Sequence, residues 1–255
     1  MKTSVLGTFA ATALLAVATA ACSGPAEAPG ENRPAESAAA ASAPAPSPTP
    51  TPTPTPTREP KAYTANDLSA ILQQLEDSTG RKLSVLANSD LTEILDQTKA
   101  LISSIEVAPA ECQQLAASNG IPSVDGAAVA LGQSTDAATG AATALSLAAG
   151  LDEATLGQVA DQPAHFEKCA NMTMTVSGVD VAVSITPMEG VGGMSNTIAY
   201  RTDTMLPDGR VQSIITAQAV EQGVLLTAVA SGGENEADDA GRAGALLDTA
   251  AALIG

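Results

Sequence analysis

Few residues in this sequence suit thiol chemistry or the usual sulfur and nitrogen ligation of zinc: there are three cysteines and one histidine. Cys112 lies in the segment VAPAECQQLA, and Cys169 follows His165 by four residues in HFEKCANM. On a helix His165 and Cys169 would share one face, so together with Cys112 they make a possible set of zinc ligands. The two cysteines could instead form a disulfide or stay as free thiols, and the compartment decides which.

The first 21 residues, MKTSVLGTFAATALLAVATAA, are typical of a secretory signal peptide. Their apolar run is shorter than an ordinary transmembrane helix, which needs about 20 apolar residues. The segment ATA at 18–20 matches a small-x-small cleavage site, which would release a soluble secreted protein. The overlapping TAAC at 19–22 resembles a bacterial lipobox, although Thr19 stands where most lipoboxes carry Leu. In that second interpretation Cys22 is lipidated by a palmitate-type acyl anchor.

Cysteine parity favours the lipoprotein. If Cys22 is lipidated, Cys112 and Cys169 remain to pair; otherwise an exported protein carries an odd, exposed thiol. Because exported thiols in an oxidising compartment usually pair, we predict a Cys112–Cys169 disulfide rather than a metal site. We therefore expect a protein on the extracytoplasmic face of the cell membrane, anchored through Cys22, with free secretion as the alternative.

The chain divides by composition into a signal peptide (1–21), a stalk (22–61) and one folded domain (62–255). The stalk is rich in Pro, Thr and Ala and has almost no large apolar residue to bury, so we expect it to be disordered. Its Thr-Pro repeat favours polyproline II, which makes a semi-rigid spacer.

The charge of the chain excludes one class of partner. The formal net charge is −17, and residues 1–61 carry equal numbers of acidic and basic side chains, so the excess of acid lies in the domain. Such a domain is repelled by nucleic acid. We predict no nucleic-acid binding.

The sequence offers little for catalysis. A single histidine leaves few partners for a nucleophile, and no G-x-S-x-G, S-x-x-K, H-E-x-x-H or P-loop motif is present. The glycine-rich EGVGGMSN at 189–196 lacks the Lys-Ser/Thr of a phosphate-binding loop, and we predict a hairpin loop there. The acidic cluster of GGENEADD at 232–239 lacks calcium-loop spacing and suits a helix N-terminus. We predict no enzyme activity and no cofactor.

The domain is predicted to be α+β, with a central antiparallel sheet of hairpins flanked by helices and one internal disulfide. Thr64 and Asp67 form a capping pair for a first helix. A second helix begins at Asp90, and its apolar residues are expected to share one buried face: Leu91, Ile94, Leu95, Leu101, Ile102 and Ile105. Pro109 opens a short helix with Cys112 on its inner side, which ends at 119–120.

The clearest strand signal is NMTMTVSGVDVAVSI, which alternates strictly around a two-residue Ser177-Gly178 turn. Further strands are expected near 196–203, 211–220 and 223–230, and 126–150 is predicted as strand, with helix as the alternative. The chain closes with a helix at about 235–254, whose inward residues are expected to be Ala243, Leu246, Leu247, Ala250 and Leu253.

Taken together, the export signal, the Pro/Thr stalk, the P-x-x-C step from Pro109 to Cys112 and the spacing to Cys169 resemble the PknH-like extracellular sensor domain. That family occurs on actinobacterial receptor kinases and as stand-alone lipoproteins. The resemblance covers 62–255 and implies an α+β domain with a cleft for an unidentified ligand. The kinase sensor carries two disulfides, whereas this chain can form one, and no ligand-binding residue carries over.

Two functions remain open. The first is a cell-envelope lipoprotein whose domain is a non-enzymatic, sensor-like module that binds a small ligand or envelope component. The second is a structural or adaptor lipoprotein that contacts an envelope partner without a small-molecule ligand. A lined cavity favours the first, and an exposed apolar patch on a filled domain favours the second.

Overall fold

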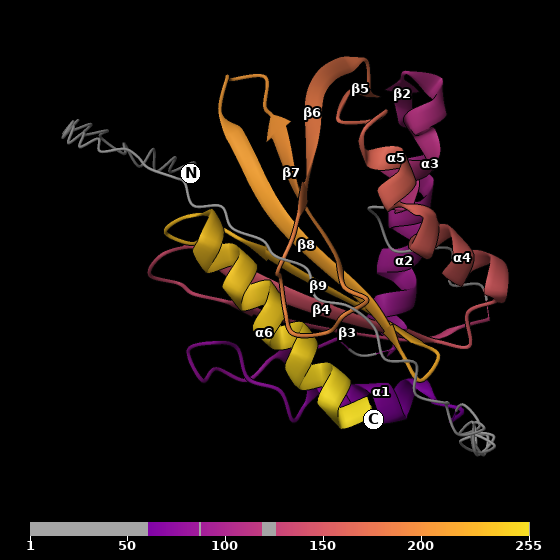
Figure 1. Ribbon diagram of the computed structural model, residues 1–255, viewed down its shortest axis with the longest axis vertical. Coiled ribbons are helices and arrows are strands. Elements are labelled where there is room, and N and C mark those ends of the chain that lie inside the picture. The colour runs from indigo at the N-terminus through magenta and orange to yellow at the C-terminus, as the bar shows by residue number, and fades with distance from the viewer. Residues whose placement is uncertain (1–60, 87, 119–125, 255) are drawn as a thin grey trace, which may run out of the picture. The chain divides into compact units, whose positions relative to one another are not determined.

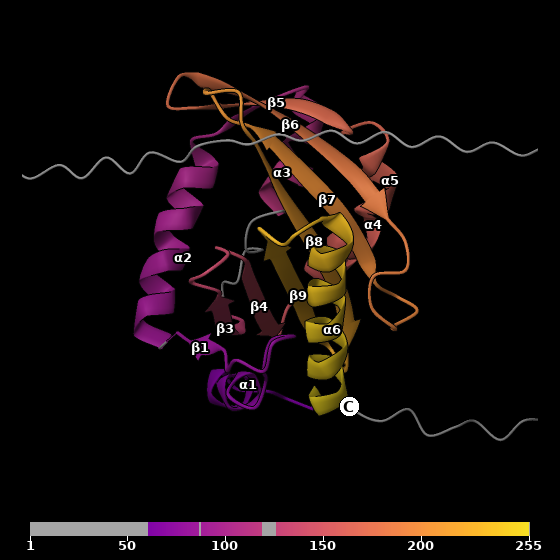
Figure 2. The same ribbon diagram turned by 90° about the vertical axis from the view of Figure 1, so that its left-hand side faces the viewer.

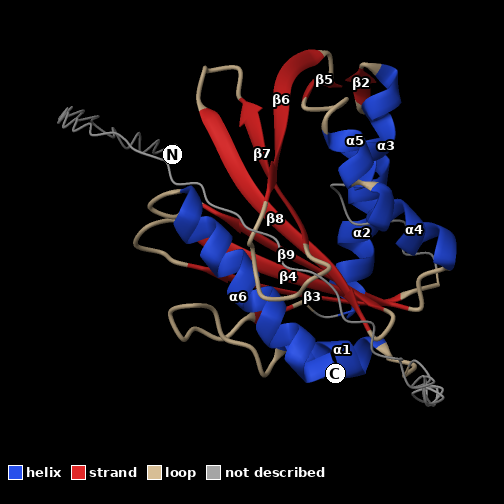
Figure 3. Ribbon diagram, in the orientation of Figure 1, coloured by secondary structure: helices blue, strands red, loops and turns tan. Residues whose placement is uncertain are grey.

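A computed structural model describes residues 61–86, 88–118 and 126–254, which form an antiparallel sheet with helices on both faces (Figures 1 and 3). The nine strands lie in the order β1-β3-β4-β9-β8-β7-β6-β5-β2. The predicted fold class, an antiparallel sheet flanked by helices, is confirmed. Along this described part of the chain, no helix is both long and apolar enough to cross a membrane. The strands are β1 (Ser84–Val85), β2 (Glu106–Ala108), β3 (Ala128–Thr135), β4 (Ala142–Ala149), β5 (Asn171–Val176), β6 (Val179–Met188), β7 (Ile198–Met205), β8 (Val211–Glu221) and β9 (Val224–Ser231).

The helices divide between the two faces of the sheet, as Figure 2 shows. On one face lie α1 (Ala65–Leu72) and α6 (Glu236–Ile254), and on the other α2 (Asn88–Ser103), α3 (Gln113–Ser118), α4 (Glu153–Asp161) and α5 (Pro163–Phe166). Strand β9 shows why helices pack on both faces, because its successive apolar side chains point to opposite faces of the sheet. Leu226 packs in the core under α6 whereas its neighbour Leu225 packs in the core of the other face.

The first helix begins as its sequence predicts. Asp67 N donates to Thr64 Oγ1 at 3.2 Å, and Thr64 N donates to Asp67 Oδ2 at 2.9 Å, which completes a capping box. Leu68, Ile71 and Leu72 are buried against the sheet. Tyr63, just before the helix, donates its hydroxyl to the carbonyl of Ile254 at 2.8 Å, and this bond joins the two ends of the domain.

The second helix differs from its prediction. It begins at Asn88 rather than Asp90, and only its start is shown to pack on the sheet, where Leu91 is 3% exposed. Ile94 and Leu101 are 38% and 52% exposed, so the prediction that they share one buried face with Leu91 is wrong. Apolar periodicity predicts which face of a helix is apolar. It does not show whether another part of the protein packs on that face. In Figure 2 the helix stands apart from the other helices on its side of the sheet.

The predicted hairpin is confirmed with its register. Val176 pairs with Val179 and Met172 with Val183, around a turn in which Ser177 and Gly178 both have positive φ, at 53° and 80°. The face of the hairpin that carries Met172, Val183 and Val179 is buried at the base, where Val183 is 6% exposed, and becomes exposed toward the turn, where Val179 is 48% exposed. Strands β3 and β4 fill the 126–150 segment, so the strand interpretation of that region is confirmed.

The final helix packs as predicted except at its end. Ala243, Leu246, Leu247 and Ala250 are buried, but Leu253 is 41% exposed and Ile254, at 3%, takes the inward place. The helix lies over small side chains of β8 and β9, namely Ala217, Ala219, Ala228 and Ala230. Small residues on both sides bring the helix backbone close to the strands, and this close approach gives a dense core in a chain with 2% aromatic residues.

A buried carboxylate, that of Asp77, links the segment after α1 to strand β3. Asp77 lies in the loop before β1 and accepts hydrogen bonds from Thr79, Arg81 and Ser134, including Arg81 Nε at 2.8 Å. Burial would raise the pKa of Asp77, but the hydrogen bonds from Ser134, Thr79 and Arg81 outweigh it and hold the pKa well below its usual value. The stabilisation of the folded state by these hydrogen bonds is therefore present at neutral pH. It is lost as the pH falls below the usual pKa of an aspartate and toward the lowered pKa of Asp77.

The glycine-rich segment 189–196 is the loop between β6 and β7, as predicted, and it rests on α6. Gly193 N lies 2.9 Å and 2.7 Å from Asp248 Oδ1 and Oδ2, so the backbone donor at this loop is taken by a carboxylate of the protein itself. A Cβ atom added at Gly244 would lie 2.5 Å from Gly192 N, which is closer than real Cβ contacts come. Gly244 therefore permits the close approach of the helix and the loop.

The close contact at Gly244 and the open space at Gly241 predict opposite effects of alanine substitution on the stability of the protein. Gly244→Ala should lower the free energy of unfolding by about 1–3 kcal/mol, because the new methyl group overlaps the Gly192 backbone. Gly241→Ala should raise it by about 0.5–1 kcal/mol, because an added Cβ meets nothing within 4 Å there and alanine favours the helix. Denaturant unfolding of both variants measures the difference, and equal stabilisation by the two would show that the loop does not pack on the helix.

Candidate functional site

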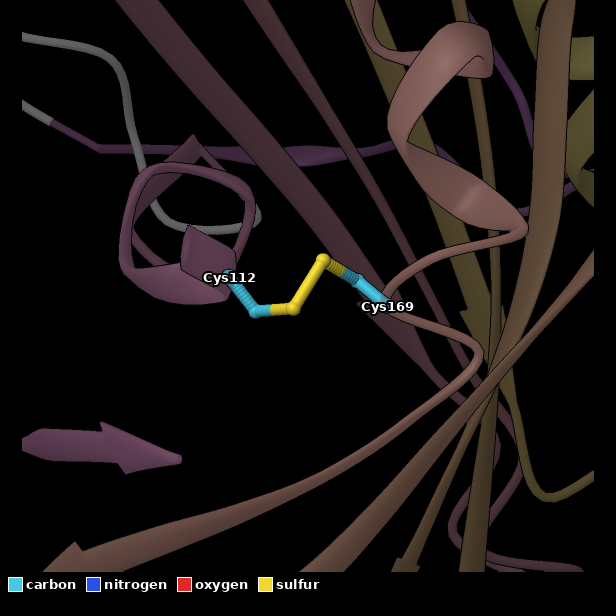
Figure 4. Close-up of a disulfide and its surroundings, with 2 residues drawn as sticks. All are labelled: Cys112 and Cys169. Carbon is cyan, nitrogen blue, oxygen red and sulfur yellow. A yellow bond between two sulfur atoms is a disulfide. The ribbon is translucent and has the colours of Figure 1, made fainter. Parts of the chain in front are cut away.

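The two cysteines of the domain are bonded to each other. Cys112 lies at the end of the short 3-10 helix Ala110–Cys112, Cys169 follows α5, and their Cα atoms are 5.6 Å apart (Figure 4). The predicted disulfide is confirmed, so neither sulfur is free to join His165 in a zinc site. The bridge spans 57 positions in the sequence, and a chain-entropy estimate for that length gives about 4 kcal/mol of stabilisation.

A small pocket lies beside this disulfide, between two walls. One wall comes from the segment around Cys112 and the other from α4, α5 and the residue that joins them. The volume open to water is about 180 Å³. The lining is mostly polar: Glu111, Gln114 and Leu115 on the first wall, and Gln158, Asp161, Gln162 and His165 on the second. The disulfide therefore joins the two walls covalently.

Local structure explains how each wall is held. Pro109 opens the turn that carries Glu111 outward and Cys112 inward, and Leu115, one turn later, is 4% exposed. On the other wall, Asp152 caps α4 by accepting from Thr155 N at 2.7 Å. Behind the pocket, the core of this face packs Phe166 on Tyr200, with ring centroids 5.1 Å apart.

Gln162 is the feature that distinguishes this pocket. The residue is 3% exposed, yet neither Nε2 nor Oε1 of its side chain has a hydrogen-bond partner in the part of the chain that the structure describes. Its backbone is satisfied, because its N donates to Val159 O at 3.2 Å and its carbonyl accepts from His165 N at 2.9 Å. A buried polar group without a partner costs about 1–3 kcal/mol. Gln162 also lines the pocket, where a ligand or ordered water could complete the hydrogen bonds of such a group.

Apart from Leu115, which is buried, the other residues that line the pocket are exposed, and their acidic side chains are its only carboxylates among the described lining residues. Glu111 and Asp161 bring two carboxylates, and His165 is exposed on α5. Among the described residues that line the pocket there is no lysine or arginine. The site therefore combines one buried amide with an acidic rim.

Two other hollows of the described surface are larger and more open. One, of about 450 Å³, lies over β5–β8 and includes Asp203, Met205 and Val211. The other, of about 670 Å³, lies between α6 and the 189–196 loop, where Asp248 already binds Gly193. Neither is lined by a polar group that is buried without a partner.

The acidic cluster at 232–239 is used by the fold. Glu236, Asp238 and Asp239 stand in the first turn of α6, where negative charge complements the helix dipole. Asp239 is buried and paired with Arg242, which also donates to Thr143 Oγ1 at 2.9 Å and to Ser231 O at 3.0 Å. The prediction that these acids belong to a helix start is confirmed. No group of three or more metal-ligating side chains comes together anywhere in the described ranges.

The sequence predicts that Cys112 and Cys169 lie together, and it places His165 near Cys169. It does not predict the pocket beside the disulfide, which His165 lines. Gln162 gives no motif, since a glutamine before a proline is an ordinary way to end one helix and begin another. Its burial depends on how the segment around Cys112 and the α4–α5 segment come together at the pocket, which is a matter of tertiary structure. The predicted lipidation site, Cys22, lies outside the described residues.

The unpaired amide predicts that an apolar replacement stabilises the protein. Gln162→Met keeps the length of the side chain and removes two unsatisfied groups, so the free energy of unfolding should rise by about 1–2 kcal/mol and Tm by a few degrees. Gln158→Met, on the exposed rim of the same pocket, should change stability by less than about 0.5 kcal/mol. Calorimetry of both variants tests this, and destabilisation by Gln162→Met would mean that the amide is bonded in the folded protein.

Comparison with known proteins adds a likeness of fold. No protein-family profile matches the sequence, and no curated protein is significantly similar to it. A solved structure described as the extracellular domain of PknH from Mycobacterium tuberculosis is similar with a TM-score of 0.46 and 15% identity, over 76% of this chain and 98% of that one. The likeness concerns the fold, and a lipid anchor and an actinobacterial source stay predictions.

Proposed function

We propose that this protein is a cell-envelope lipoprotein, anchored through Cys22, whose extracytoplasmic domain is a non-enzymatic, sensor-like module that binds a small ligand in the pocket between α3, α4 and α5. The observation that carries the ligand site is Gln162, which lines the pocket and whose buried side-chain amide has no hydrogen-bond partner among the described residues. Proteins leave few buried polar groups unsatisfied, and such exceptions often mark a place where another molecule supplies the bond.

Location is supported by the cysteines. Two of the three are joined in a disulfide, which is typical of exported proteins. The third, Cys22, follows a signal-like segment and has no further cysteine in the chain to pair with, which suits lipidation. The Pro/Thr-rich segment after it would hold the domain away from the membrane.

A binding role suits the pocket better than catalysis. The sole histidine of the chain lies at its rim and donates its backbone N–H to the carbonyl of Gln162, and the described residues that line the pocket include no serine, threonine or free cysteine to act as a nucleophile. Nucleophilic catalysis needs such a group beside its base. Glutamine amides bind and orient ligands but do not exchange protons with them at neutral pH.

One surface favours the adaptor alternative. Met205 and Val211 are register partners at the ends of β7 and β8, and they are 53% and 56% exposed. With Val179 at the tip of the neighbouring hairpin, 48% exposed, they give that end of the sheet an apolar character. Exposed apolar residues that lie together on a surface are typical of protein contacts.

Native mass spectrometry tests ligand binding. The whole chain with Cys22→Ala is purified from an exporting host under non-denaturing conditions, beside the same chain with Gln162→Met. A reproducible extra mass on the first protein, absent from the second, is expected. Bare protein mass across several growth conditions would contradict a ligand-binding role and favour the adaptor.

The anchor has a separate test. In the native host, Cys22→Ala should move the protein from the membrane fraction to the medium, because it removes the acyl chains that hold it. Cys22→Ala leaves the disulfide intact, so the released protein should show no free thiol. Continued membrane retention of this variant would contradict lipidation at Cys22.

A further inference from the structure

We infer that the pocket between α3, α4 and α5 takes a small amino-amide, a molecule that joins a primary carboxamide to an ammonium group. This inference rests on the proposed ligand-binding role of the pocket and adds the chemistry of the ligand. It follows from three properties of the site: the hydrogen-bonding groups of Gln162, the charge of the rim and the volume.

Gln162 requires both a donor and an acceptor from its ligand. Its Nε2 needs an acceptor and its Oε1 needs a donor, and each has less than 1 Å² exposed to solvent. A primary carboxamide presents a carbonyl oxygen and an N–H side by side, so it can pair with the glutamine amide through two bonds. A carboxylate presents two acceptors and no donor, and it would leave Oε1 unpaired.

The rim of the pocket selects for positive charge. Glu111 lines one wall and Asp161 the other, and no lysine or arginine is among the described lining residues. The surrounding chain has a formal net charge of −17, which adds to the attraction for a cation. An ammonium group near these carboxylates gains charge-assisted hydrogen bonds, whereas a carboxylate or phosphate ligand is repelled.

The volume restricts the ligand to a small molecule. About 180 Å³ is below the roughly 300–1,000 Å³ of pockets that hold drug-sized compounds. Leu115, which is buried and lines the pocket, offers an apolar surface to a methylene group between the two polar ends. Glycinamide has this arrangement: a carboxamide, one methylene group and an amine.

Three probes separate the contributions of amide and charge. The whole chain with Cys22→Ala, labelled with ¹⁵N, is titrated at pH 6.5 with glycinamide, glycine and acetamide, and the Gln162 side-chain NH₂ signal is identified by its loss in Gln162→Met. Glycinamide should shift this signal and bind at least tenfold more tightly than glycine, which replaces the amide by a carboxylate. It should also bind at least tenfold more tightly than acetamide, which lacks the ammonium.

Matched variants assign the effect to the pocket. Glu111→Gln combined with Asp161→Asn removes both charges while it keeps side-chain size, and should weaken glycinamide at least tenfold and leave acetamide unchanged. Glu153→Gln, on the exposed first turn of α4 and outside the pocket lining, should change neither. Glycine binding as tightly as glycinamide, or no loss in the double variant, would overturn the inference.

The test also separates this inference from the proposed function. A natural adduct that Gln162→Met abolishes, together with no response to glycinamide, would leave the ligand-binding role in place and exclude amino-amides as its ligand class. No adduct and no response would contradict both.

Discussion

The Cys112–Cys169 bond is the interaction on which the candidate site depends. It joins the turn after β2 to the segment after α5, so the two walls of the pocket cannot separate while the bond is intact. The same bond ties this corner of the helical layer to β5, since Cys112, Phe166, Cys169 and Met172 share one buried cluster. A short helix such as α3, with six residues, has little stability of its own and needs such a tie to keep its position.

On the opposite face of the sheet, stability comes from close packing instead of a covalent bond. Helix α6 presents alanines and Gly244 to the alanine-rich strands β8 and β9 and to the 189–196 loop. Small side chains let backbones approach closely, and dense packing then supplies contacts that aromatic residues give in other cores. The two faces therefore differ: one carries the largest buried cluster, under α1 and α6, and the other has two smaller clusters, the disulfide and the polar pocket.

Gln162 places stability and function in opposition. An apolar side chain would suit its buried position better than an unpaired amide does. Proteins commonly accept such local losses at sites where activity needs a particular group. The rest of the domain offsets the loss, since Asp77 and Asp239 are buried polar groups that do bind partners within the protein. The contrast between these satisfied groups and Gln162 is what directs attention to the pocket.

The local elements can be predicted from the sequence alone: the Thr64–Asp67 cap, the Ser177-Gly178 hairpin with its register, the strands and the cysteine pair. Each follows from residues close in sequence or, for the cysteines, from parity and export. By contrast, the exposure of Ile94, Leu101 and Leu253 and the burial of Gln162 become clear only from the way in which the elements pack together. Burial depends on which surfaces pack together in the folded protein. The type of a single side chain, apolar or polar, does not specify which residues distant in sequence will cover it.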